Sequence, residues 1–194
     1  PNQVFTLGLW ALKSIDAGST WSNLSRSMHV DYHALWIDRT NPNRMVAGND
    51  GWAYLSRDGG KNWRPWNTLP VGQPTTLAIE DKAVYNVFVG LQDNGTMKGP
   101  STHRPGVDHI SRWTSIGGGD GSYIAIDPRG DVVYTASQFG SHSAFDQAKN
   151  QRWPARAPDK VGEPDLRYNW ISPFAISQFH PDIVYVGSQK LHRS

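Results

Sequence analysis

The chain of 194 residues contains no cysteine and no apolar run near the ~20 residues that a membrane-spanning helix requires. Without cysteine there is no disulfide, no thiolate zinc site and no cysteine nucleophile. The formal net charge is only +2, and no block of like charge indicates a nucleic-acid groove or an anionic membrane surface. No segment sustains the apolar period of an α-helix, so we expect helix to be minor.

Glycine and proline are plentiful instead, with 19 glycines, 13 prolines and a hydrophobic share of 38%. Such a composition is typical of a turn-rich protein built mostly from strands. The main signal is repetition, because SIDAGSTW, from Ser14 to Trp21, returns as SRDGGKNW, from Ser56 to Trp63. Serine, aspartate, glycine and tryptophan keep their places, which indicates an architecture of repeated units.

One complete unit runs from His33 to Trp63. It predicts four strands joined by a turn at Asn41-Pro42, a glycine-rich corner and the Ser-Asp-Gly turn. Later segments repeat its first two strands at intervals of roughly 40 to 50 residues. The first strands contain Ile37, Ile79, Ile126 and Ile176, and the second strands contain Val46, Phe88, Tyr134 and Tyr185. These repeats predict an all-β fold, a β-propeller of four-stranded antiparallel blades.

We expect a single propeller domain over residues 1–194, or a fragment of a larger propeller with about four to five blades in this chain. The expected divisions are a partial blade at 1–28, blades at 29–68, 69–117 and 118–168, and a partial blade at 169–194. A fragment would close through a composite blade or pair with a second copy as a homodimer, since bare sheet edges promote aggregation.

Turn chemistry alone accounts for the repeated octet. An aspartate accepts N–H groups from the residues that follow it, glycine supplies a positive φ, and tryptophan returns onto the blade as an apolar anchor. We therefore predict a structural role for Ser14, Asp16, Gly18, Trp21, Ser56, Asp58, Gly60 and Trp63.

The octet S-x-D-x-G-x-[TN]-W resembles the Asp-box, or BNR repeat, of sialidases, xyloglucanases and sortilin-type receptors. The wider phrases HALWIDRTNPNRMVAGNDG, VGLQDNGT and IGGGDG resemble the sortilin/Vps10-like BNR-repeat proteins of bacteria, often labelled glycosyl hydrolases and similar to xyloglucanase propellers. This resemblance implies a propeller with the box on its rim, and a secreted or periplasmic location. The Arg-Ile-Pro motif of sialidases does not occur, which argues against sialidase activity.

Three glycine-rich corners, GNDGW, LQDNG and GGGDG, each hold an aspartate: Asp50, Asp93 and Asp120. Strand ends near a propeller axis line its funnel, so we expect these carboxylates to converge there as catalytic groups. The alternative is that they only hold their corners by bonding backbone amides. In the xyloglucanases an Asp-Gly-Gly corner carries one catalytic carboxylate, and Asp50 is its nearest counterpart, although Trp52 replaces the second glycine.

The residues that we predict to bind substrate are Trp52, His33, Gln92, Asn94 and Gln138. Trp52 offers a face for a sugar ring, with blade packing as the alternative. Two polar insertions, Thr96 to Arg112 and Gln147 to Tyr168, are expected to be long loops suited to recognition.

A metal site is one interpretation of His29, Asp31 and His33, which would share a face if residues 29–33 formed a strand. The alternative is that His33 opens the first strand of its blade and bonds the neighbouring strand, while His29 lies in a loop. We favour the second interpretation and predict no metal and no cofactor.

Two functions fit the sequence. The first is a carbohydrate-active, glycoside hydrolase-like propeller that acts on a β-linked polysaccharide through paired aspartates. The second is a non-catalytic module that binds a peptide, a protein or a glycan. Neither needs nucleic acid or a membrane span.

Overall fold

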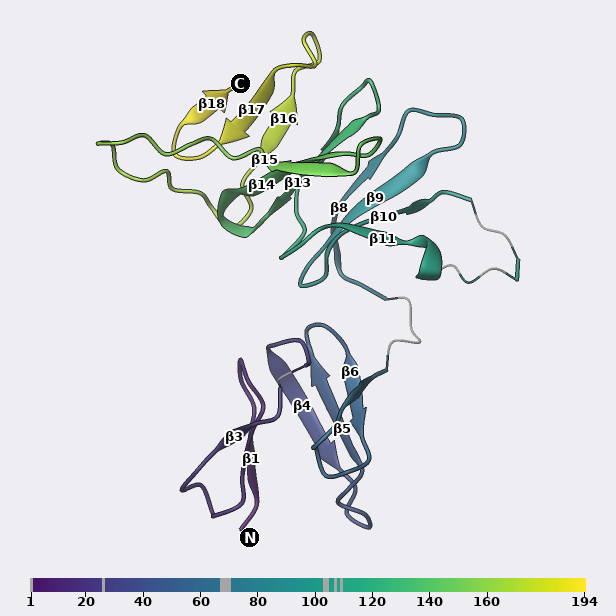
Figure 1. Ribbon diagram of the computed structural model, residues 1–194, viewed down its shortest axis with the longest axis vertical. Coiled ribbons are helices and arrows are strands. Elements are labelled where there is room, and N and C mark those ends of the chain that lie inside the picture. The colour runs from purple at the N-terminus through teal and green to yellow at the C-terminus, as the bar shows by residue number, and fades with distance from the viewer. Residues whose placement is uncertain (1, 26, 67–70, 103–104, 107, 109) are drawn as a thin grey trace. The chain divides into compact units, whose positions relative to one another are not determined.

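The computed structural model describes residues 2–25, 27–66, 71–102, 105–106, 108 and 110–194. The chain folds as two compact units, Pro1–Val71 and Gly72–Ser194 (Figure 1). All regular structure in the described residues is β, apart from two short 3₁₀ turns, η1 (Ile110–Arg112) and η2 (Gln138–Gly140). Among these residues no helix combines the length and the apolar character that crossing a bilayer demands.

The first unit contains two antiparallel sheets whose strands follow chain order. The first sheet is β1 (Val4–Thr6), β2 (Leu12–Ser14) and β3 (Ser22–Asn23). The second is β4 (Tyr32–Ile37), β5 (Met45–Asn49), β6 (Ala53–Ser56) and β7 (Arg64–Pro65).

The second unit contains three sheets of the same kind. They comprise β8 (Pro74–Ile79), β9 (Asn86–Leu91), β10 (Gly95–Pro100) and β11 (Thr114–Gly117); then β12 (Ile124–Ile126), β13 (Val132–Ser137), β14 (Ser141–Asp146) and β15 (Gln151–Pro154); and last β16 (Phe174–Ile176), β17 (Val184–Gly187) and β18 (Leu191–Arg193). The predicted fold class, all-β with small antiparallel blades, is confirmed sheet by sheet, and every predicted marker isoleucine, valine, phenylalanine and tyrosine lies in its expected strand.

Each unit forms its core between the faces of successive sheets. In the first unit, Ala11 and Met28 pack with Tyr32, Ala47 and Tyr54 of the second sheet. Side chains on the same face recur at every second residue of a strand, so one apolar stripe per strand is enough to cover a neighbouring sheet.

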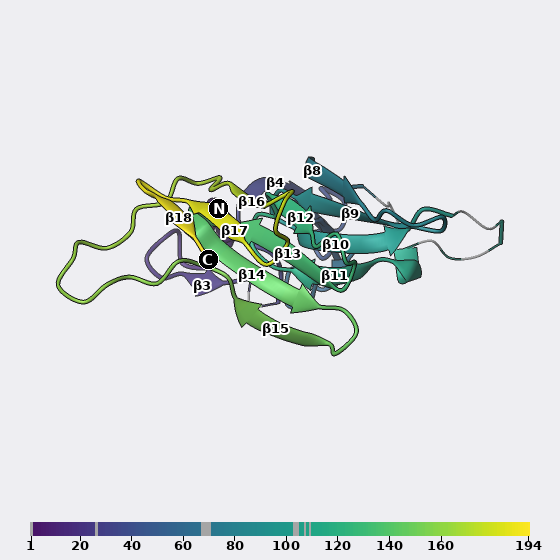
Figure 2. The same ribbon diagram turned by 90° about the horizontal axis from the view of Figure 1, so that it is seen from above.

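The second unit repeats this packing twice. Phe88 and Ile116 of the first sheet pack against Val133 of the second, and both Phe88 and Val133 are 0% exposed. On the other face of the second sheet, Ala136 packs with Phe174 and Val186 of the third. The three sheets succeed one another from teal through green to yellow in Figures 1 and 2. Sequential meanders stacked face to face are the arrangement of propeller blades.

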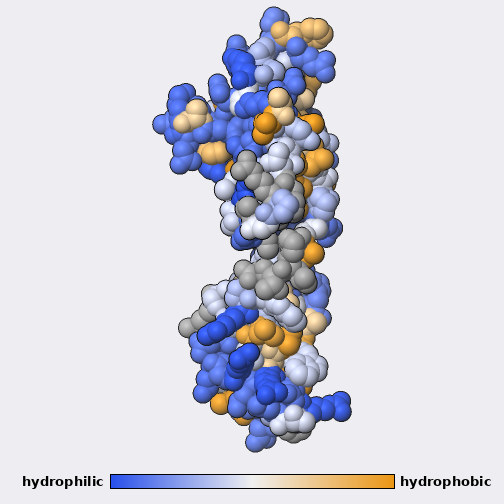
Figure 3. Space-filling model, turned by 90° about the vertical axis from the view of Figure 1, so that its right-hand side faces the viewer, coloured by the Kyte–Doolittle hydropathy of each residue, from blue (hydrophilic) through white to orange (hydrophobic). Residues whose placement is uncertain are grey.

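Apolar side chains also reach the surface of both units (Figure 3). On the outer face of the β4–β7 sheet, Trp36 is 56% exposed beside Val46 and Leu55, next to a hollow of about 520 Å³. On the β8–β11 sheet, Leu77 and Ile79 are likewise exposed. Within its own unit, each of these sheets thus buries one face more completely than the other.

The two predicted recognition loops are shorter than expected. The segment from Thr96 opens as strand β10, which runs to Pro100 and pairs with β9 along its whole length. Residues 103, 104, 107 and 109 of this prediction lie outside the described part of the chain. In the second predicted loop, Gln151–Pro154 forms β15 on the edge of its sheet. Both segments have a weak strand propensity, so the sequence did not predict strands there. They form strands because neighbouring strands pair with them.

The two Ser-Asp-Gly turns have nearly the same hydrogen bonds. In the second, the Ser56 hydroxyl donates to Asp58 Oδ1 at 2.9 Å and accepts the Gly60 N–H at 2.9 Å. The Asn62 backbone N–H donates to Asp58 Oδ1 at 2.9 Å, and its side-chain Nδ2 donates to Asp58 Oδ2 at 2.7 Å. Gly60 has a φ of 87°, a conformation that suits glycine.

The first turn replaces Asn62 by Thr20, whose amide and hydroxyl donate to Asp16 at 2.8 and 2.6 Å. The two tryptophans differ: Trp63 packs against the core of its unit and donates to the Gly60 carbonyl at 3.1 Å, whereas Trp21 stays 44% exposed.

These bonds predict an acid-sensitive contribution to stability from Asp58. Hydrogen bonds from Asn62 lower the pKa of Asp58 from 3.8 to about 2. The folded-state pKa is thus below the unfolded one, so the contribution is complete above 3.8 and is lost as the pH falls toward 2. Asp58→Ala should reduce the free energy of unfolding in urea at about pH 6, and this deficit should shrink on acidification. The exposed Asp81→Ala is the control, and a deficit that stays constant with pH would contradict the assignment.

Candidate functional site

Asp50 lies on the turn between β5 and β6, and Asn49 holds that turn. The Asn49 Oδ1 atom accepts the N–H groups of Gly51 and Trp52 at 3.1 and 2.9 Å, and its Nδ2 donates to the His29 carbonyl at 2.7 Å. The Asp50 N–H donates to the Asp31 carbonyl at 3.2 Å. The turn is therefore tied to the segment that leads into β4.

The Asp50 carboxylate is paired with His33. The distance from His33 Nε2 to Asp50 Oδ1 is 2.6 Å, and their side chains are 71% and 30% exposed. His33 is the second residue of β4, and Asp50 directly follows the neighbouring strand β5. The pair presents an imidazole and a carboxylate together at the surface of the first unit.

The metal-site interpretation fails at the backbone. Asp31 has a φ of 61°, and the pairing of β4 with β5 shifts register between Tyr32 and Ala34. The alternation that would put His29, Asp31 and His33 on one face is therefore broken. In the described part of the chain, no group of three or more His, Cys, Asp or Glu side chains is placed to hold a metal ion.

Trp52 packs against the core of its unit and is partly buried. The structure thus places it in the packing position that the sequence left as an alternative to sugar stacking. Gly51 is needed beside it, because a Cβ there would lie 2.5 Å from the His29 side chain.

In the second unit, two of the predicted aspartates meet. The Asp120 Oδ1 atom accepts the Asp93 N–H at 2.9 Å, and the Asp120 N–H donates to Gln138 Oε1 at 2.8 Å. Asp120 is only 7% exposed. Asp120 thus joins the turn after β9, through its carboxylate, to the turn after β13, through its backbone N–H, which is a structural role.

Gln92 and Asn94 belong to the same turn as Asp93. The Gln92 N–H donates to the Gln73 carbonyl at 2.9 Å, and Asn94 Nδ2 donates to the Gln92 carbonyl at 3.2 Å. The structure therefore brings together the five predicted residues of the second unit, and Asp120 is bonded both to Asp93 and to Gln138. Convergence of Asp50 on the same mouth stays a prediction.

Glycines let the backbones of this region pack closely. The Gly121 N–H donates to the Leu91 carbonyl at 2.9 Å, and the Gly95 N–H donates to the Gly119 carbonyl at 2.8 Å. A Cβ on Gly121 would lie 2.1 Å from the Gly95 carbonyl oxygen, and a Cβ on Gly95 would lie 2.3 Å from that of Gly117. The glycines are thus explained by the close approach of β11 and of the segment before β12 to the turn between β9 and β10.

A glycine pair tests this explanation. Gly121→Ala forces its methyl group into backbone that cannot move aside, so it should reduce the free energy of unfolding by about 2 kcal/mol or more. Gly118→Ala, three residues earlier, meets nothing within 4 Å and should change it by less than about 0.5 kcal/mol. Urea unfolding measures both variants, and equal effects would contradict the packing role.

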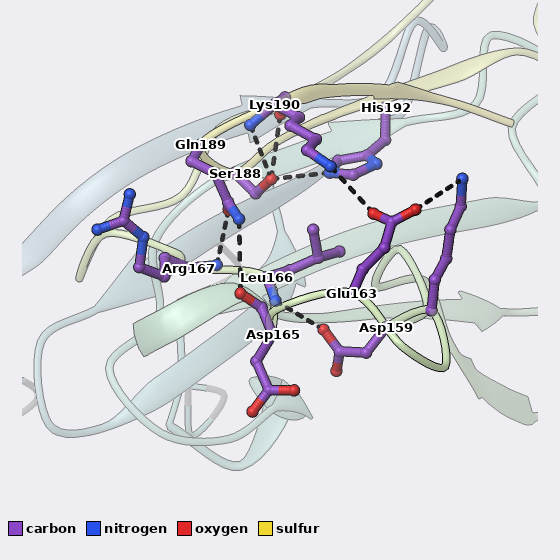
Figure 4. A network of polar contacts seen from close by, with 10 residues as sticks. Asp159, Glu163, Asp165, Leu166, Arg167, Ser188, Gln189, Lys190 and His192 are labelled. Atoms are coloured by element: carbon purple, nitrogen blue, oxygen red, sulfur yellow. Dashed lines mark hydrogen bonds and ion pairs between the residues drawn. The ribbon is translucent and has the colours of Figure 1, made fainter.

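The segment that leads into β16 is fixed by polar contacts with the β17–β18 hairpin (Figure 4). Gln189 forms two hydrogen bonds with the backbone of Arg167. Its Oε1 atom accepts the Arg167 backbone N–H at 2.7 Å, and its own backbone N–H donates to the Arg167 carbonyl at 3.0 Å. Lys190 Nζ lies 3.1 Å from Glu163 Oε2, and this hydrogen bond lowers the pKa of Glu163. The hairpin therefore holds the segment just before Trp170.

One group of polar residues escaped the sequence-based predictions. Thr135 and Ser137 of β13 face Ser143 and Ser141 of β14 across the register, and the four hydroxyl-bearing residues line a cavity of about 310 Å³. The signal was present in TASQFGSHS, where hydroxyls recur at every second residue on each side of the turn.

The similarity of this chain to known proteins is partial. No protein-family model matches the chain. An oligoxyloglucan-reducing end-specific xyloglucanase of Emericella nidulans is 32% identical over 84 residues, which are 41% of this chain and 10% of that protein. The chain thus spans about a tenth of this relative's length.

The solved structures that are similar to the chain include two GH74 enzymes and YCF48. The GH74 xyloglucanase of Xanthomonas campestris has a TM-score of 0.40 at 16% identity, covering 99% of this chain and 34% of that one. An ancestral GH74 enzyme has a TM-score of 0.37 at 14% identity, with 96% and 29% covered. YCF48 bound to a D1 peptide has a TM-score of 0.34 at 14% identity, with 99% and 75% covered.

Proposed function

We propose that this chain is part of a carbohydrate-active, glycoside hydrolase-like β-propeller that acts on a β-linked polysaccharide of the xyloglucan type. The sequence likeness to a xyloglucanase supports the substrate class. The stacked meander sheets support the architecture, and the Ser-Asp-Gly turns support its Asp-box character. A secreted or periplasmic location belongs to the same proposal, since a polysaccharide is met outside the cytoplasm.

The observation that carries the proposal is the exposed pair of Asp50 and His33. The Asn49 bonds fix the turn, and His33 Nε2 lies 2.6 Å from Asp50 Oδ1, so the carboxylate has a defined orientation at the surface. A carboxylate that accepts a hydrogen bond suits the base or nucleophile of glycoside hydrolysis. The reaction also needs a carboxylic acid.

The second candidate function is a non-catalytic module that binds a glycan or a peptide. It is favoured by Asp120, whose carboxylate is buried and accepts the Asp93 amide. The sequence predicts Asp120 as catalytic, but its hydrogen bonds to two turns favour a structural role, whichever of the two functions the chain has.

Asp50 can be tested by hydrolysis of xyloglucan oligosaccharides. Asp50→Asn keeps the size of the side chain but removes its basicity, so reducing-sugar release by the 194-residue chain should fall by at least about 100-fold. Asp81→Asn, an exposed aspartate on the turn after β8, is the matched control and should keep full activity.

Hydrolysis by Asp50→Asn at the wild-type rate would contradict the catalytic role. A wild-type chain that binds the oligosaccharides without releasing reducing sugar would contradict the enzyme and favour the binding module.

A further inference from the structure

A buried histidine contacts the segment that leads into β16. His142 of β14 is only 5% exposed. Its ring centroid lies 5.8 Å from that of Tyr168 and 5.5 Å from that of Phe174, and it meets both rings edge to face. The second unit thus encloses a titratable imidazole that the proposed function does not use.

The two ring nitrogens of His142 have different surroundings. Nε2 lies 3.0 Å from the Ser172 carbonyl, which can only accept a hydrogen bond, so Nε2 carries the proton of the neutral ring. Nδ1 is shielded from solvent and has no hydrogen-bond partner in the described part of the chain. A second proton, on Nδ1, would therefore place a positive charge and an unmatched donor among apolar rings.

The groups that face His142 favour its neutral form. Strand β13 presents Ala136, directly opposite in the register, and β16 presents Phe174, and neither side chain titrates. The segment before β16 presents the Tyr168 phenol and the Arg156 guanidinium, which lies 4.6 Å from the centroid of the Tyr168 ring. The positive charge of Arg156 would repel an imidazolium.

A second histidine lies on the same face of the β16–β18 sheet and serves as a reference. His192 and Phe174 are both paired in register with Val186, so their side chains share that face. Unlike His142, His192 is partly exposed, and its Nε2 atom lies 2.7 Å from the Ser188 hydroxyl oxygen (Figure 4).

Residues 155–172, here called the strap, are held at two places. At the end of the strap, His142 bonds the Ser172 carbonyl. Farther back, Gln189 and Lys190 of the β17–β18 hairpin hold it through bonds that involve no histidine (Figure 4). A charge on His142 would therefore loosen one end of the strap and leave the other in place.

The end of the strap positions an exposed aromatic pair. The Trp170 carbonyl accepts the Phe139 N–H at 3.1 Å, and the centroids of the two rings lie 5.0 Å apart. The two residues are 47% and 57% exposed. Departure of this end would separate the rings and free the Phe139 amide.

We propose that His142 is a pH-sensitive latch, in which the neutral imidazole holds the end of the strap against β14 and protonation of Nδ1 releases it. The latch goes beyond the proposed function and does not rest on it, because it involves neither Asp50 nor His33.

The sign of the pH dependence follows from the surroundings of the ring. Burial lowers the pKa of His142 from its ordinary value of 6.5, with the bond to Ser172 acting in the opposite direction and Arg156 adding to the decrease. The folded-state pKa is thus below the unfolded one. The contribution of the latch is complete above 6.5 and is lost as the pH falls through the folded-state pKa.

Hydrogen exchange of the 194-residue chain at about pH 7.5 and about pH 5 tests the latch, with rates expressed as protection relative to an unstructured peptide at the same pH. In the wild type, the Phe139 amide should lose at least about fivefold in protection at the lower pH. His142→Gln still has a donor for the Ser172 carbonyl but cannot be charged, so its loss should be less than about twofold. His192→Gln is the matched control and should behave as the wild type does.

An NMR titration of the wild-type His142 ring keeps the test decisive where the glutamine variant folds poorly. Its midpoint should lie below 6.5, and a midpoint at or above that value would overturn the latch. Unchanged protection of Phe139 in the wild type, or an equal loss in His142→Gln, would also overturn it. Equal loss of protection in β9 would show global acid unfolding instead, with the same consequence.

Discussion

Burial of one sheet's face against the next is the interaction on which the rest of this structure depends. The sheets contain only three or four strands, and the strands contain two to six residues, so none would be stable alone. Phe88 and Val133 lose all contact with water because they come from consecutive sheets. A fully buried side chain of this size contributes about 1.5–3 kcal/mol, and the order of the blades follows from such contacts.

Close stacking dictates the chemistry of the turns. Sheets that pack face to face bring the turn after β9 against the segment before β12, and there only glycine fits between two backbones. Asp120 spans that junction, which explains why an aspartate among glycines is structural there. The turn at Asp50 is held by Asn49 instead, so its carboxylate remains partly exposed. Similar sequence patterns thus serve different purposes because their neighbours differ.

The sequence predicted what depends on local pattern. Alternating apolar residues located the strands around Ile37, Ile79, Ile126 and Ile176, and turn chemistry anticipated the bonds of Asp16 and Asp58. What depends on neighbouring strands was missed. Because Asp31 has a positive φ and the strand register shifts beside it, His29, Asp31 and His33 do not share one face as a continuous strand would require. Residues 96–100, predicted as part of a loop, belong to β10 because they pair with β9. The alternating hydroxyl-bearing residues of β13 and β14 are visible in the sequence. The sequence does not show the packing around these strands, so it did not predict the cavity that the residues line.

The most direct test of this account is hydrogen exchange of Phe88→Ala, observed by mass spectrometry. Removing a ring that two sheets share should cost about 3–5 kcal/mol, and amides of β9 and β13 should lose protection together, because neither sheet is stable without the other's face. Loss of protection confined to the β8–β11 sheet, with β13 unchanged, would show that the sheets are stable independently and would contradict the account.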